Sequence, residues 1–75
     1  MKEVDATGKL CPMPLIMAQE YANHADAGTE FALLATDPGV HEDIPAWCRM
    51  HGHCIVSTDE SATEIRMTIR LKTVD

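Results

Sequence analysis

The sequence predicts an α+β two-layer sandwich, in which a four-stranded mixed sheet carries two helices on one face in the order β-α-β-α-β-β. Two stretches with helical spacing of apolar residues alternate with short apolar runs. The chain then ends in a regular alternation of apolar and polar residues. Its 75 residues leave room for one sheet and one or two helices, so we predict a single domain over residues 1–75.

The first strand and helix are predicted from local signals in the N-terminal third. Residues 2–6 form a short strand, which Gly8 ends. A helix then begins at Pro12 or Pro14, because the amide that proline lacks would have no partner in a first helical turn. The helix runs to about residue 24, and the small alanines in its apolar stripe indicate close packing on a sheet.

The second strand and helix follow the same plan. The mostly apolar run at residues 30–36 is typical of a central strand. Asp37 and Pro38 then suit the N-cap and first position of a helix over residues 39–51. Pro45 lies inside this helix and removes one backbone hydrogen bond, so we expect a kink or a short 3₁₀ start there.

Two further strands complete the predicted sheet. Residues 53–58 form the third strand, residues 59–63 form a turn, and residues 65–71 alternate so that one face is buried. The basic residues of this region share the other face, which is either a solvated surface or a docking patch for an acidic partner: Arg66, Arg70 and Lys72.

Composition narrows the function classes. Acidic residues outnumber basic ones by 12 to 6, which argues against direct nucleic-acid binding, because phosphate contacts need clustered Lys and Arg. No apolar run approaches the ~20 residues of a membrane span, and the first residues lack the apolar segment of a signal peptide. The three cysteines include no CxxC pair, so we expect free thiols in a cytoplasmic protein.

Cys11 is the predicted catalytic residue. It stands in the run GKLCPMP at the expected helix start, where free amides and a partial positive charge favour an anion. We therefore predict an accessible N-cap thiol with a pKa below the ~8.5 of a free cysteine. Four neighbours are expected to shape the site by freeing or stiffening the turn or by flanking the sulfur: Gly8, Pro12, Met13 and Pro14. The alternative is a small buried side chain at a strand-to-helix turn.

No general base can be assigned beside Cys11. Lys9 offers a nearby charge, and Asp5 or Asp37 are carboxylates that the fold could bring close. The acidic group at residues 41–43 is interpreted as a first helical turn that complements the helix dipole.

The other candidate residues have structural interpretations. Cys48 lies on the apolar face of the second helix beside Trp47, so we favour core packing and keep it as a possible secondary thiol. Cys54 is expected to be structural or partly exposed. The HGHC segment at residues 51–54 is too compact for a usual zinc site, so no metal site is predicted. Four methionines are interpreted as core filler: Met13, Met17, Met50 and Met67.

The run Cys11-Pro12-Met13-Pro14, after a short strand and a glycine, resembles the CPxP signature of the TusA/SirA-like sulfur carriers. Residues 37–48 resemble the second helix of that family, and the resemblance covers nearly the whole chain. It implies a cytoplasmic sulfurtransferase whose CPxP cysteine accepts persulfide sulfur and passes it on, with no cofactor beyond that transient persulfide.

The resemblance also implies classes of partner. The donors would be cysteine desulfurases or rhodaneses, and the acceptors DsrE-type or other proteins in tRNA thiolation or sulfur oxidation. Other members of the family serve molybdenum-cofactor maturation or accompany a thiosulfate transporter. A monomer without nucleic-acid or membrane contacts suits such a shuttle. Two alternatives are a non-catalytic interaction module and a thiol redox sensor, in which Cys48 or Cys54 would resolve an oxidised Cys11.

Overall fold

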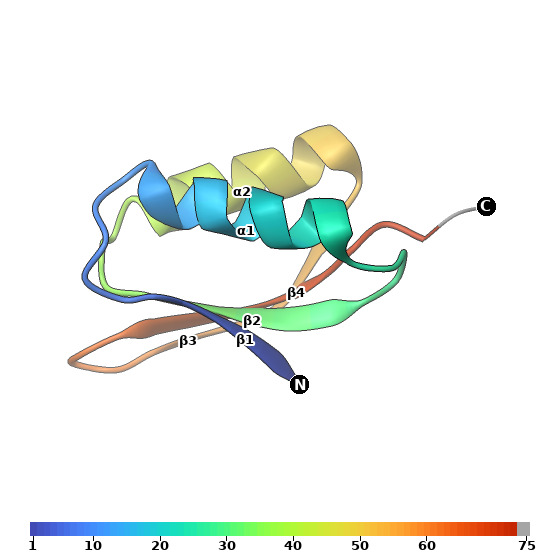
Figure 1. The fold of residues 1–75 in the computed structure, drawn as a ribbon. Coiled ribbons are helices and arrows are strands. Elements are labelled where there is room, and N and C mark those ends of the chain that lie inside the picture. The colour runs from blue at the N-terminus through green and yellow to red at the C-terminus, as the bar shows by residue number, and fades with distance from the viewer. Residues whose placement is uncertain (74–75) are drawn as a thin grey trace.

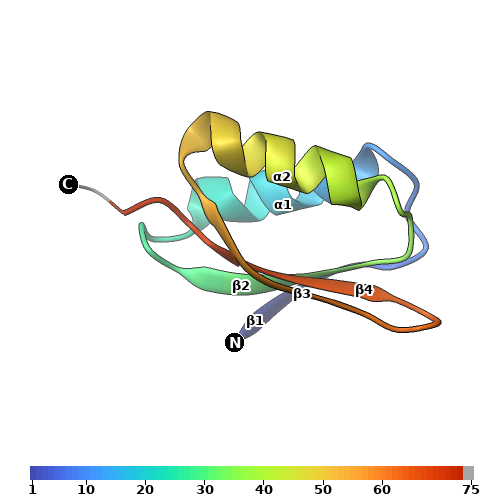
Figure 2. The same ribbon diagram turned by 180° about the vertical axis from the view of Figure 1, so that it is seen from behind.

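The computed structural model describes residues 1–73 and confirms the predicted fold class, with two helices lying along one face of a four-stranded sheet (Figures 1 and 2). The last two residues of the predicted domain lie outside this described range. The elements, in chain order, are β1 (Lys2–Ala6), α1 (Met13–His24), β2 (Glu30–Ala35), α2 (Val40–His51), β3 (Cys54–Glu60) and β4 (Ile65–Arg70). Within residues 1–73, neither helix has the length and hydropathy that crossing a bilayer requires.

The strand order explains where the loops meet. The sheet has the order β1-β2-β4-β3, in which β1 and β2 are parallel and the other neighbours are antiparallel. Ala6 lies opposite Ala35, so β1 and β2 end at the same edge of the sheet. The loops that follow them therefore run side by side toward the starts of α1 and α2, at the left of Figure 1 and the right of Figure 2.

The core fills the space between the sheet and the helices. Every second residue of the two central strands points toward the helices, as the alternation in β4 predicts. Ala18 is fully buried in α1, which is consistent with close packing of that helix on the sheet. The largest fully buried side chains are Phe31, Leu33, Ile44, Met67, Ile69 and Pro14.

The other face of the sheet carries two of the three basic residues considered above. Arg66 Nη1 donates to Glu3 Oε2 at 2.6 Å, and Arg70 Nε donates to Glu30 Oε2 at 2.9 Å. Exposed pairs of this kind contribute little to stability. Both arginines are nevertheless paired with glutamates of the same chain. This pairing favours the interpretation of this face as a solvated surface over a docking patch for an acidic partner.

Two local expectations are wrong: a short 3₁₀ segment at Pro45 and a core position for two methionines. Helix α2 is α-helical from Val40 to His51, because Pro45 removes only its own bond to the carbonyl of His41. Met13 and Met50 are not core residues, since 42% and 82% of their surfaces are exposed. Met67, by contrast, is buried as expected.

Candidate functional site

Cys11 lies on the surface, in the turn that joins β1 to α1. The N-cap of α1 is Pro12, which follows Cys11 in a cis peptide bond, and Pro14 is buried in the first helical turn. Cys11 is therefore exposed, as expected. It is not the N-cap residue that the sequence predicts, because it precedes the N-cap of α1 by one residue.

Two hydrogen bonds tie the backbone of the Cys11 loop to the loop after β2. The amide of Gly8 donates to Thr36 Oγ1 at 2.9 Å, and the amide of Cys11 donates to Asp37 Oδ2 at 2.6 Å. The other carboxylate oxygen of Asp37 accepts the amide of Gly39 at 2.9 Å. These amides of Gly39 and Cys11 hold the pKa of Asp37 below its ordinary value, so this carboxylate is a charged bridge between the two loops.

The thiol of Cys11 makes the third link between the loops. Its Sγ donates to Oδ2 of Asp43, in the first turn of α2, at 2.5 Å. This bond, then desolvation, then the charges of Asp43 and Asp37 raise the pKa of Cys11 to about 11. The prediction of a lowered pKa is wrong, because two carboxylates outweigh the partial charge of a helix start to which Cys11 does not belong. In the free protein at neutral pH, Cys11 is a hydrogen-bonded thiol.

Asp5 and Lys9 do not take part in this arrangement. The amide and hydroxyl of Thr7 both donate to Asp5 Oδ1, at 3.0 and 2.6 Å, so Asp5 organises the turn after β1. Lys9 is exposed, and none of the ion pairs among residues 1–73 includes it.

Two glycines near the sulfur have different roles. Gly39 has the helical φ of −56°, and a Cβ added there would lie 3.2 Å from Cys11 Cβ and 3.4 Å from Cys11 Sγ. Gly39 therefore gives the sulfur its space. Gly8 has a φ of +78°, with nothing within 4 Å of an added Cβ. Its role is therefore conformational, because a left-handed backbone favours glycine.

Substitution of each glycine by alanine should separate these roles. We expect Gly39→Ala to slow the reaction of Cys11 with a bulky maleimide severalfold, because the added methyl group lies against the sulfur. Gly8→Ala should instead cost about 1 kcal/mol of stability from the left-handed backbone, with little change in maleimide rate. Stopped-flow labelling and urea unfolding measure the two effects, and the reverse pattern would contradict this assignment.

An apolar surface lies beside the thiol. Leu10 precedes Cys11 and is 76% exposed, while Met13 and Ile16, three residues apart at the start of α1, are 42% and 40% exposed. We call these three residues the apolar rim. Exposed side chains of this size next to a reactive group are typical of a surface that contacts another protein.

The other two cysteines lie elsewhere. Cys48 is buried in the core, as expected, and burial raises its pKa to about 11. Cys54 is exposed at the start of β3, opposite Arg70 in the sheet. In the HGHC segment, His53 Nδ1 accepts the amide of Lys72 at 2.8 Å and its ring packs on Trp47, so His53 has a structural role. Nothing in these positions favours a disulfide partner for Cys11.

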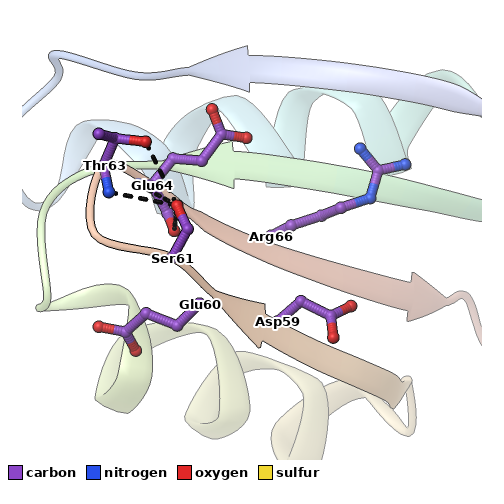
Figure 3. A pocket seen from close by; sticks show the side chains of 6 residues that line it. All are labelled: Asp59, Glu60, Ser61, Thr63, Glu64 and Arg66. Carbon is purple, nitrogen blue, oxygen red and sulfur yellow. Dashed lines mark hydrogen bonds between the residues drawn. The ribbon is translucent and has the colours of Figure 1, made fainter.

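A shallow hollow of about 290 Å³ lies at the β3–β4 turn and does not contain Cys11. Its lining residues are Asp59, Glu60, Ser61, Thr63, Glu64 and Arg66 (Figure 3). The Ser61 hydroxyl accepts the amides of Thr63 and Glu64, at 3.2 and 3.1 Å, which closes the turn. His41 lies 2.8 Å from Glu60, so the turn is tied to α2 near the thiol and adds acidic residues to that end.

Sequence reasoning missed Asp43 and Gly39. The sequence assigns Asp43 to an acidic first helical turn and Gly39 to a helix start, and links neither residue to Cys11. The available signal was the repeated strand-loop-helix order, because parallel pairing of the first two strands would place the start of the second helix beside the Cys11 loop.

Comparisons with known proteins agree with this architecture. The family model described as Sulfurtransferase TusA matches residues 2–71. The sulfur carrier protein TusA of Pseudomonas putida, in each of three strains, is 36% identical over 69 residues, which cover 92% of this chain and 86% of the relative. The crystal structure of a SirA-like protein from Desulfitobacterium hafniense has the same fold, with a TM-score of 0.81 at 23% identity, and the match covers 96% of this chain and 99% of that one. The family match includes both loops that meet at Cys11, and the chain belongs to the TusA sulfurtransferase family.

Proposed function

We propose that this protein is a sulfur carrier in which Cys11 accepts a sulfane sulfur as a persulfide and relays it to a protein acceptor, in tRNA thiolation or sulfur oxidation. The observation that carries the proposal is the exposed position of the CPxP cysteine in a chain of the TusA family. No pocket is needed for this chemistry, because the reacting group of the donor is itself presented by a protein.

The transfer step balances without an added oxidant. The thiolate of Cys11 attacks the outer sulfur of a donor persulfide, the new Sγ–S bond forms, and the S–S bond of the donor breaks. The donor cysteine leaves as a thiolate and takes up the proton that the Cys11 thiol gives up, so that a thiol and a persulfide become a persulfide and a thiol. Attack by an acceptor thiolate on the loaded sulfur then returns Cys11 to the thiol.

The surroundings of Cys11 support a relay between proteins. The loop that carries Cys11, the start of α1 with the rest of the apolar rim, and the start of α2 lie at one end of the molecule (Figure 1). Two partners can therefore reach the same exposed sulfur in turn. A cysteine desulfurase or rhodanese would serve as donor and a DsrE-type protein as acceptor. A reducing compartment such as the cytoplasm suits the cycle, because Cys11 must return to a free thiol.

Sulfur loading followed by intact mass tests the proposal. The experiment uses a Cys54→Ser background, because Cys54 is a second exposed thiol. The reduced protein is incubated with inorganic polysulfide, and we expect its mass to rise by one sulfur atom. Addition of Cys11→Ser to this background should abolish the gain. Addition of a small thiol should then remove the extra sulfur as hydrogen sulfide. An unloaded Cys54→Ser protein, or equal loading after Cys11→Ser is added, would overturn the proposal.

A further inference from the structure

We propose that Asp43, together with Asp37, makes Cys11 selective for positively charged sulfur donors and acceptors, so that a partner protein meets the sulfur with a Lys or Arg side chain. This inference rests on the proposed function and deepens it, because it names the chemistry of the partner surface. Asp43 acts here as a specificity-determining residue for the transfer.

The charges beside the sulfur are uncompensated in the free chain. Within residues 1–73 the ion pairs join His41 to Glu60, Arg66 to Glu3 and Arg70 to Glu30, and none of them includes Asp37 or Asp43. Asp37 receives two backbone amides, whereas the bond that the structure gives to Asp43 comes from the Cys11 thiol. A full negative charge therefore lies in contact with the reacting atom.

Contact with a partner during sulfur transfer adds a desolvation cost to the charge on Asp43. A partner cysteine must come within bonding distance of Sγ, and its surface then removes water from the carboxylate of Asp43. A carboxylate that loses water is disfavoured unless a cation or several hydrogen-bond donors pair with it. The Cys11 thiolate that forms during attack would add a second negative charge beside it. A Lys or Arg on the partner compensates both charges at once.

The rest of this end of the molecule is also rich in negative charge. In residues 5–11 and 36–43, four acidic residues accompany one lysine, Lys9. The β3–β4 turn lies at the same end of the molecule in Figure 1 and adds carboxylates of its own, among them those of Glu60 and Glu64 (Figure 3). A surface of one charge sign raises the local concentration of oppositely charged partners and repels like ones. Together with the apolar rim, it fits a partner surface that is both apolar and basic.

Thiol–disulfide exchange with small reagents of different charge tests the selectivity without a partner protein. The reagents are cystamine, which is cationic, hydroxyethyl disulfide, which is neutral, and dithiodiglycolate, which is anionic. Rates for Cys11 in a Cys54→Ser background are divided by the rates for a neutral free thiol. We expect the normalised cystamine rate to exceed the dithiodiglycolate rate by about tenfold at low salt. High salt should reduce this ratio toward one.

Substitutions test whether Asp43 and Asp37 cause the preference for the cationic disulfide. Asp43→Asn should lose most of the cationic preference, and Asp37→Asn part of it. Glu42→Gln is the matched control, because it removes the same charge from an exposed neighbour that is not bonded to the thiol. The ratio compares two reagents on one thiolate, so a change in the pKa of Cys11 cancels. Equal normalised rates in the wild type, or a preference retained in Asp43→Asn, would overturn the inference.

Failure of this inference differs from failure of the proposed function. A protein that takes up sulfur from polysulfide on Cys11 but shows no preference among the disulfides is a carrier without this selectivity. A protein that prefers cystamine but takes up no sulfur retains the selectivity and loses the carrier function. If a variant folds poorly, the effect of salt on the ratio of the cystamine and dithiodiglycolate rates of the wild type still tests the selectivity.

Discussion

Replacement of Asp43 by Asn should make Cys11 of the free protein react about tenfold faster with iodoacetamide near neutral pH. The thiolate is the reacting species, and the pKa of Cys11 is about 11 against an ordinary 9.0, chiefly because of Asp43. A return toward the ordinary value would increase the thiolate fraction by up to roughly 100-fold, since each pH unit changes it about tenfold. The lower basicity of the thiolate offsets about half of this gain on a logarithmic scale, through a Brønsted coefficient of ~0.5.

The pH dependence of the alkylation rate shows in which direction Asp43 shifts the pKa of Cys11. With a raised pKa, the alkylation rate of the wild type should keep rising about tenfold per pH unit until the pH approaches the pKa. The profile of Asp43→Asn should level off at lower pH, because its thiol ionises earlier. Glu42→Gln should follow the wild type. An Asp43→Asn profile that is unchanged or shifted to higher pH would contradict the role of this carboxylate in holding the thiol proton.

Replacement of Ile44 by Ala should lower the free energy of unfolding by about 2–5 kcal/mol. Ile44 is fully buried, directly after Asp43 on α2, and its side chain helps to seat that helix on the sheet. A domain of this size has a total stability of roughly 4–11 kcal/mol, so the loss would leave a marginal protein. Urea unfolding measured by tryptophan fluorescence gives the change.

Ile16 offers a matched control for this experiment. It is the same residue type on the other helix, but 40% of its surface is exposed. We expect Ile16→Ala to change the free energy of unfolding by less than about 1 kcal/mol. A loss at Ile44 as small as the one expected at Ile16 would show that the side of α2 that carries Ile44 is not the side that packs on the sheet.

Local patterns were enough to predict the elements and much less informative about the site. The alternation in β4 and the helical spacing in α2 depend on residues close together in the chain, and both elements lie where these patterns place them. The bond from Cys11 to Asp43 joins residues 32 positions apart, and it exists because β1 and β2 are parallel neighbours. No local pattern encodes that pairing.

The pKa of Cys11 illustrates the same limit. The rule that a helix start favours an anion needs Cys11 to be the N-cap, but Cys11 precedes the N-cap by one residue and its thiol donates to Asp43. The carboxylates that then dominate its environment come from another segment of the chain. Met50 shows a related limit, because its apolar side chain is exposed and composition alone could not assign it to a helix face.

The hydrogen bond between Cys11 and Asp43 has a consequence for the two states of a carrier. In the empty protein the thiol of Cys11 donates a hydrogen bond to Asp43. In a persulfide Sγ carries no hydrogen, so Sγ of the loaded Cys11 cannot donate this bond. The terminal sulfur would instead add a second anion to a surface that is already acidic. Full and empty forms would therefore present different charge to the outside, and an acceptor could recognise its cargo by electrostatics alone, without any rearrangement of the backbone.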